Sequence, residues 1–148
     1  MTKVRLSNLP FILLLLLVAS CEEIRNEPPD ISTLEGEWIV EEYSSFYKSS
    51  DVTTYNVYIT FSRDDSTTLY ISNFYHLGYE NEIAGKVDEN RVELHSGQEL
   101  TSLQSVYTLL NGVGNISTDY QTIDWEYTIG DGSGVVDNVT ATYTQVER

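Results

Sequence analysis

Few side chains of this sequence have the types and spacing of a catalytic site. The two histidines, His76 and His95, have no neighbour at a spacing that indicates a base and its partner. Neither the G-x-S-x-G turn of serine hydrolases nor a Ser/His/Asp pattern stands out. We therefore interpret both histidines as ordinary polar residues rather than as general bases or metal ligands.

Adjacent acidic residues, such as Glu41–Glu42 and Asp64–Asp65, could indicate acid–base chemistry. Neighbouring residues of a strand point to opposite faces, so Glu41 and Glu42 should not converge. The Asp64–Asp65 pair is typical of a turn, where Asp bonds to the nearby backbone. A glycosidase needs two inward carboxylates at a defined separation. No such pair can be nominated, so we expect no enzymatic activity.

The sequence predicts neither a metal site nor a cofactor. A glycine-rich segment, 130–134, together with Asp137 offers oxygen ligands for Ca²⁺, but it lacks the spacing of an EF-hand. A glycine-rich hairpin is the favoured interpretation. One Cys and two His are too few for a Cys/His zinc site, which usually has four such ligands.

Length and composition indicate one folded domain rather than a nucleic-acid-binding or disordered chain. The 148 residues contain 41% hydrophobic amino acids, which is enough for a core. With 8 Lys and Arg against 23 Asp and Glu, the formal charge is −15. Binding to nucleic acid requires clustered basic residues, so that class is excluded. A single Cys allows no intramolecular disulfide.

The N-terminal sequence is typical of an export signal. Lys3 and Arg5 precede an apolar run over 11–18, which is too short for a membrane-spanning helix of about 20 residues. The following Val18-Ala19-Ser20-Cys21 resembles the lipobox of bacterial lipoproteins. The resemblance implies cleavage before Cys21, a diacylglyceryl group on its thiol and acylation of the new amine. An ordinary secretory signal cut near Ser20 is the alternative.

Three segments follow from this interpretation: a lipoprotein signal peptide over 1–20, a lipidated and flexible acidic tether over 21–33, and a folded domain over 34–148. The acidic residues directly after Cys21 resemble the surface-export tether of Bacteroidota lipoproteins. We therefore expect a lipid anchor to the outer membrane, with the domain on its periplasmic or surface face. Pro28–Pro29 disfavours helix in the tether.

From residue 34 onward, apolar and polar residues alternate with the period of a strand. Strands are expected over 36–44, 54–62, 67–74, 82–88, 91–95, 105–110, 112–118, 121–129 and 136–144. The segments 105–110 and 112–118 are also compatible with one strand bent at Gly112 and Gly114. Short turns imply antiparallel neighbours, and eight strands close economically as an up-and-down barrel. A two-sheet sandwich is the alternative.

The segment Gly36-Glu37-Trp38 at the start of the first strand resembles the G-x-W motif of lipocalins and related barrels. The resemblance implies that Gly36 is the turn residue at the barrel floor and that the Trp38 ring closes this end. Several further segments resemble small lipocalin-like lipoproteins of Bacteroidota: 71–75, 96–98, 112–117, 123–128, 131–132 and 139–143. We expect two departures from true lipocalins: a single Cys allows no disulfide, and the sequence predicts no helix between the last strand and Arg148.

Aromatic residues give the best indication of function. Those expected to point into the barrel are Trp38, Tyr55, Phe61, Trp125, Tyr127 and Tyr143. So many rings favour a filled lumen; an open one would hold a small, largely apolar ligand oriented by Tyr hydroxyls. We therefore expect a non-catalytic binding or structural barrel. The alternative is a surface module that binds a glycan or protein through outward tyrosines, namely Tyr43, Tyr58, Tyr70 and Tyr107. An enzyme is the remote third alternative.

Overall fold

The computed structural model describes residues 31–45 and 52–147, and almost all of its regular structure is β-strand. A 3-10 helix, η2 (Ile31–Leu34), precedes the strands, and a second one, η3 (Phe74–His76), interrupts them. The strands are β1 (Gly36–Ser44), β2 (Thr53–Phe61), β3 (Thr68–Ser72), β4 (Glu82–Asp88), β5 (Arg91–Leu94), β6 (Gln98–Thr101), β7 (Val106–Ile116), β8 (Thr122–Gly130) and β9 (Val136–Gln145). Cys21 and the segment before Ile31 lie outside the described residues. Within the described ranges, no helix is long and apolar enough to cross a membrane.

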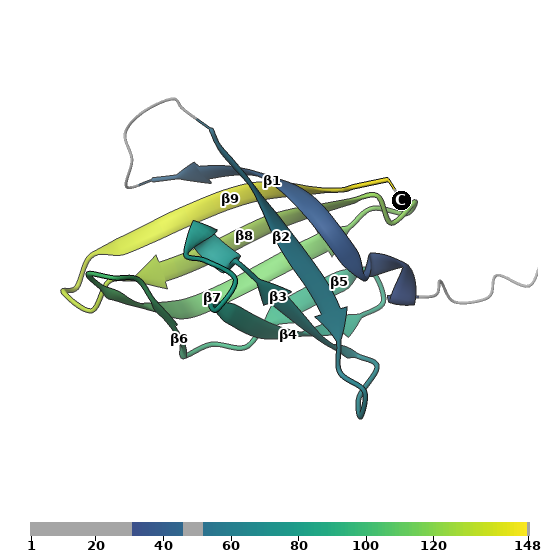
Figure 1. Cartoon of the computed structure of the whole chain (residues 1–148), viewed down its shortest axis with the longest axis horizontal. Coiled ribbons are helices and arrows are strands. Elements are labelled where there is room, and N and C mark those ends of the chain that lie inside the picture. Colours follow the sequence, from purple (N-terminus) through teal and green to yellow (C-terminus); the bar gives the residue numbers. More distant parts are fainter. Residues whose placement is uncertain (1–30, 46–51, 148) are drawn as a thin grey trace, which may run out of the picture. The chain divides into compact units, whose positions relative to one another are not determined.

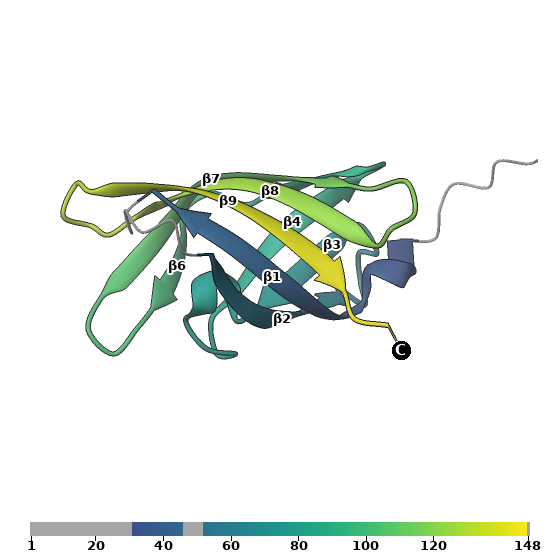
Figure 2. The same ribbon diagram turned by 90° about the horizontal axis from the view of Figure 1, so that it is seen from above.

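The strands close into a ring. Neighbours pair antiparallel in chain order from β1 to β5, and β7, β8 and β9 lead back to β1. Pairing of Arg91–Glu93 in β5 with Val113–Asn115 in β7 completes the circle. The prediction of an all-β, eight-stranded antiparallel up-and-down barrel is therefore confirmed (Figures 1 and 2). Closure leaves the ring without a free edge along most of its length.

β6 is a ninth strand that the sequence analysis did not predict. It pairs with β7 over Val106–Leu109, next to the part of β7 that pairs with β5. The short segments β5 and β6 thus act as one interrupted strand along a single edge of β7. Only Leu100 of β6 is an apolar buried residue, so no alternation marks this segment in the sequence.

Between β4 and β6, side chains replace the backbone ladder. The Gln98 carboxamide accepts from Ala84 N at 2.7 Å and donates to Ala84 O at 2.9 Å. The Asn81 carboxamide accepts from Thr101 N at 2.6 Å and donates to Thr101 O at 2.9 Å. Each amide thus satisfies a donor and an acceptor, as an opposing strand would. We call this contact the amide seam.

A bulge in β7 sets which residues of this strand face inward. The segments predicted at 105–110 and 112–118 are one strand, and its register to β8 shifts between Leu109 and Asn111. The extra residue reverses the alternation, because it adds one position without a partner. Tyr107 consequently shares the inward side of Leu109 and packs against the core, so the prediction that it faces outward is wrong.

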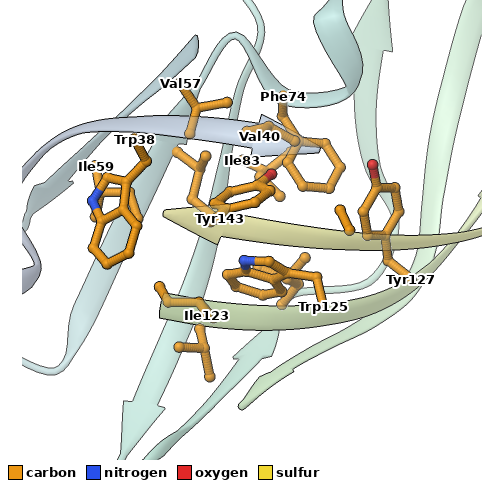
Figure 3. Close-up of a cluster of buried hydrophobic side chains, with 14 of the residues drawn as sticks. Trp38, Val40, Val57, Ile59, Phe74, Ile83, Ile123, Trp125, Tyr127 and Tyr143 are labelled. Carbon is orange, nitrogen blue, oxygen red and sulfur yellow. The ribbon is translucent and has the colours of Figure 1, made fainter. Parts of the chain in front are cut away.

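The barrel interior is filled with side chains. Figure 3 shows Trp125 and Tyr143 in the middle of the core, with Trp38 and Ile59 toward one side and Phe74 and Tyr127 toward the other. All of these residues are at most 2% exposed. Glycine makes room for the largest ring: a Cβ on Gly114 would lie 2.8 Å from the Trp125 indole. The favoured expectation of a filled lumen agrees with this packing.

The helix η2 covers the barrel end at which β1 begins. Gly36 has a φ of 132°, a backbone conformation that side chains disfavour, so glycine suits this entry into β1. Trp38 is fully buried, and its Nε1 donates to Leu34 O at 2.9 Å. The end of β9 lies at the same end, where the Gln145 amide donates to Thr33 O at 2.6 Å. We call this end the floor.

Candidate functional site: the barrel mouth

The opposite end, here called the mouth, is formed by the segments 73–81, 102–105 and 131–135 and by the last residues of β1 (Figure 1). Antiparallel order alone brings these connections together, because each joins two strands at the same end. The mouth contains buried acidic and tyrosine side chains, whereas the floor and middle are mostly apolar.

The segment around η3 plugs the mouth. Phe74 is fully buried, and its ring lies 4.7 Å from that of Tyr127. Asn73, Tyr75 and His76 all have φ near +60°, which costs non-glycine residues of order 1 kcal/mol each. The Asn73 side chain holds this turn, since it donates to Asn56 O at 2.6 Å and accepts from Gly78 N at 2.8 Å.

A buried carboxyl group lies beneath the plug. Glu42 is 5% exposed and accepts hydrogen bonds from Tyr55 Oη at 2.5 Å and from Tyr127 Oη. Burial raises the pKa of Glu42, and the two tyrosine hydrogen bonds oppose that rise only in part. Burial also raises the pKa of Tyr55 and Tyr127, so both hydroxyls remain protonated donors at neutral pH.

Two more polar groups lie deeper in the core. Tyr143 Oη and Trp125 Nε1 are buried and make no hydrogen bond within the described chain. Their rings pack at 5.5 Å from each other. Leaving such groups unpaired costs roughly 1–3 kcal/mol each, so the core carries more polar groups than folding alone requires.

Asp137 connects three elements at the rim. It is 4% exposed and accepts from Ser44 Oγ at 2.5 Å, Ser45 Oγ at 2.8 Å and Tyr75 Oη at 2.7 Å. These bonds tie the end of β1 and the plug to β9. Asp137 therefore faces inward, although it lines one cavity together with Asp131 and Val135 of the glycine-rich turn.

The glycine-rich turn is held by its own acidic residue. Both carboxylate oxygens of Asp131 are used inside the turn, with bonds from Ser133 N at 2.9 Å, from Ser133 Oγ and from Val135 N at 3.2 Å. This is the hairpin geometry that was favoured over a Ca²⁺ loop. Among residues 31–45 and 52–147, no three His, Cys, Asp or Glu side chains gather closely enough to hold a metal ion.

A small cavity opens between the plug and the β8–β9 turn. Its volume is about 120 Å³. Two of its walls are the rings of Tyr75 and Tyr107, whose centroids lie 5.7 Å apart at an interplanar angle of 66°. The full lining is Tyr75, Ser105, Tyr107, Ile129, Asp131, Val135 and Asp137. We call this space the rim cavity.

A wider, more open groove of about 850 Å³ adjoins the rim cavity, with which it shares Ser105 and Tyr107. It lies between the segments 73–80 and 101–107. Leu103 is fully exposed there, and Tyr79 is 59% exposed. Of the two spaces at the mouth, the rim cavity is the less open and the outer groove the more open.

The structure separates the predicted inward residues into three groups. Gly36 and Trp38 lie at the floor, Trp125 and Tyr143 in the middle, and Tyr55 and Tyr127 beside Glu42 at the mouth. Phe61, at the floor end of β2, is only half-buried. None of them lines the rim cavity.

The predicted outward tyrosines differ in exposure, and the two histidines differ in their surroundings. Tyr43 and Tyr58 are exposed, whereas Tyr70 is half-buried. His95 is exposed, and the His76 ring stacks on Tyr55 at 4.9 Å.

The sequence did not predict that three residues would lie at the mouth: Glu42, Tyr75 and Asp137. Glu42 shares the strand parity of Trp38 and Val40, so the alternation itself placed its carboxyl group inside. Asp137 likewise alternates with Val139. Tyr75 lies in an irregular turn, where no periodicity indicates its direction.

Comparison with known proteins gives no further assignment. No protein-family model matches the chain, and no curated protein matches its sequence. The closed eight-stranded barrel is consistent with a lipocalin-like fold, and this agreement concerns architecture only. The function is therefore argued from the mouth itself.

Proposed function

We propose that this chain is a non-catalytic binding barrel and that its ligand site is the mouth rather than the deep lumen. The rim cavity is the observation that carries this proposal. The middle and floor of the barrel are occupied by rings, whereas about 120 Å³ remains beside Asp137, Tyr75 and Tyr107. A concave space in which polar groups converge beside aromatic and apolar side chains is typical of small-molecule sites.

Binding without catalysis is supported by the positions of the two buried carboxyl groups. Asp137 lines the rim cavity, but Glu42 does not. Each accepts hydrogen bonds from tyrosine or serine hydroxyls that help to hold the mouth together. A pair acting as acid and base would have to face a common substrate. We therefore assign both groups to organisation of the mouth.

The proposed cellular setting rests on the N-terminal sequence. The basic start, the apolar run and the lipobox-like Val18–Cys21 support a lipoprotein held in the outer membrane by acyl chains on Cys21. The resemblance to small lipocalin-like lipoproteins of Bacteroidota supports the same assignment. Two or three acyl chains would anchor the domain firmly without a spanning helix.

Native mass spectrometry of the intact protein, purified gently from cell envelopes, tests ligand binding at the mouth. We expect a small co-purifying mass, which Val135→Trp should remove because the larger ring occupies the entrance of the rim cavity. Ile39→Trp is the matched control, since Ile39 is 41% exposed on the outer face of β1. Absence of cargo in the native protein, or cargo that persists in Val135→Trp, would contradict the proposal.

A second candidate function is recognition of a glycan or protein by the outer groove. The observation that favours it is the exposure of Tyr79 and Leu103 on opposite walls of this groove. Aromatic and apolar side chains of this kind stack on sugar rings or anchor protein partners. Binding to immobilised glycans should fall at least tenfold in Tyr79→Ala and remain unchanged in Tyr58→Ala, which alters an outer tyrosine of β2. Equal binding by both variants would exclude the groove.

A further inference from the structure

The plug over the mouth, residues 73–78, packs on the same two tyrosines that hold the Glu42 carboxyl group. We propose that the plug is a lid that stays closed while Glu42 is protonated and opens as this group ionises. The inference goes beyond the proposed function, because it concerns access to the barrel interior and not the ligand of the rim cavity. Three observations support it: the contacts between Glu42 and the plug, the groups around Glu42 and the backbone of the plug.

Two tyrosines connect Glu42 to the plug. The Tyr55 hydroxyl donates to Glu42 Oε2 at 2.5 Å, and its ring stacks on the His76 ring with centroids 4.9 Å apart and an interplanar angle of 13°. The Tyr127 hydroxyl donates to the same oxygen, and its ring lies 4.7 Å from that of Phe74 (Figure 3). The hydroxyl ends of both tyrosines thus hold the carboxyl group, while their rings carry the plug. Hydration of Glu42 from the mouth therefore requires the plug to move.

The groups around Glu42 favour its neutral form. The described groups that act on it from the other elements are Tyr55 of β2, Tyr127 of β8, Tyr143 and Asp137 of β9, and His76 of η3. Burial raises the pKa of Glu42, and Asp137 raises it further as a like charge. The tyrosine hydrogen bonds and His76 lower it by less. Ionisation of Glu42 is consequently favoured in an arrangement that lets water reach the carboxylate.

The plug is held differently from the strands around it. β1, β2, β8 and β9 each pair with a strand on both sides, so their backbones are fixed. The plug instead contains three non-glycine residues with φ near +60°, a backbone conformation that side chains disfavour. Its backbone bond from Phe74 N to Asn81 O is long, at 3.4 Å. Segments with strained backbone and few ladder bonds open locally before the rest of a fold does.

Proton linkage gives the sign and the limit of the effect. The closed lid holds the Glu42 proton more tightly than an open lid that leaves the carboxyl group hydrated. Opening therefore releases a proton once the pH exceeds the usual pKa of 4.5. The equilibrium constant for opening should rise from there by at most about tenfold for each pH unit, and it should level off above the raised pKa of the closed state.

Hydrogen exchange of the intact chain, followed by NMR from about pH 5 to 7, tests the lid. The reporters are two plug amides: His76 N, which donates to Asn73 O at 3.2 Å, and Leu77 N, which donates to Phe74 O at 3.3 Å. We expect their protection factors, corrected for the intrinsic rate at each pH, to fall at least about threefold over this range. Low urea should leave exchange of the plug unchanged and accelerate that of the β8–β9 ladder, because local opening exposes little surface.

Four variants separate Glu42 from the other ionisable groups. Glu42→Gln should make protection of the plug independent of pH, whereas Glu41→Gln on the outer face of β1 should behave as the original protein. His76→Phe keeps an aromatic ring on Tyr55 without an ionisable group, so the pH dependence should remain. Tyr55→Phe keeps the stacked ring but removes a hydrogen bond that lowers the pKa of Glu42, so the fall should continue to higher pH.

Several outcomes would overturn the lid. Constant protection of the plug in the original protein is one, and a pH dependence that persists in Glu42→Gln or disappears in His76→Phe is another. Equal urea dependence of the plug and the β8–β9 ladder would show that the plug opens only with the whole barrel. If Glu42→Gln does not fold, an unshifted pH dependence in Tyr55→Phe overturns the inference. Cargo loss in Val135→Trp tests the rim cavity alone, so the two proposals fail separately.

Discussion

At the scale of single residues, Glu42 has unfavourable surroundings for its charged form. Its carboxyl group lies in a barrel interior and is contacted by hydroxyls that can donate but carry no positive charge. Removing a carboxylate from water is costly unless it is compensated, and here burial outweighs the two hydrogen bonds. Strand parity alone placed this residue inside, but sequence could not show that Tyr55 and Tyr127 would meet it.

Replacing Glu42 should change how stability depends on pH. Because the folded protein holds this proton more tightly than the unfolded chain, the free energy of unfolding should fall as pH rises above the usual value of 4.5. Glu42→Gln removes this titration. We expect the melting temperature of Glu42→Gln, relative to that of the original protein, to improve as the pH rises above 4.5.

Glu41→Gln is the control for this measurement, since Glu41 is exposed on the outer face of the same strand. A constant difference in melting temperature between Glu42→Gln and the original protein across this pH range would show that Glu42 does not titrate as described.

Trp38 should be the costliest single side chain to remove from the floor. Trp38→Ala deletes a fully buried ring and its bond to Leu34 O, so unfolding in denaturant should lose about 3–5 kcal/mol. Ile39→Ala, the outward neighbour, should change stability by less than about 1 kcal/mol. Similar losses for the two variants would mean that Trp38 does not close the floor.

At the scale of elements, the sequence predicted the strands well wherever one face was buried and the other wet. β1, β2, β8 and β9 lie within one residue of their expected bounds because their alternation is unbroken. The direction of a side chain could not be predicted where an irregular backbone, rather than strand alternation, determines it. The bulge in β7 turned Tyr107 inward, and the left-handed turn of η3 pointed Phe74 into the core. Neither feature has a periodic signal, so the rim cavity could not be predicted.

Gly114 lets β7 pack closely against Trp125 of β8, because glycine has no Cβ. Gly114→Ala would place a Cβ 2.8 Å from the ring of Trp125, a side chain that is only 1% exposed. Overpacking of this kind should cost about 1–3 kcal/mol. Gly130→Ala is a matched control on β8, since its Cβ would meet Leu110 at an ordinary 3.5 Å. Equal denaturation midpoints for these two variants would contradict the close approach of Trp125 to β7.

At the scale of the whole barrel, the two ends differ in the side chains that they contain. The floor and middle provide a rigid packed body, while the polar groups gather at the mouth. A closed ring with a filled interior tolerates such a division because the strands fix the positions of the mouth segments. Binding would then require only local adjustment of side chains rather than opening of the barrel.

Attachment to the membrane should depend on one sulfur atom. Cys21→Ser would remove the proposed acceptor of a diacylglyceryl group, so labelling with a radioactive fatty acid should disappear. The protein should become soluble or stay attached only through an uncleaved signal peptide. Ser20→Ala keeps a small residue before the Cys and should be labelled normally. Persistent labelling of Cys21→Ser would refute lipidation at this position.

Deamidation of an asparagine in the amide seam would change the structure of the barrel. The Asn81 amide nitrogen donates to both Leu77 O and Thr101 O. Hydrolysis of that amide to a carboxylate would exchange a donor for a negative oxygen facing two carbonyl oxygens, which repel it. Deamidation at this one asparagine would therefore loosen the β6–β7 hairpin from β4 while the rest of the ring stayed paired.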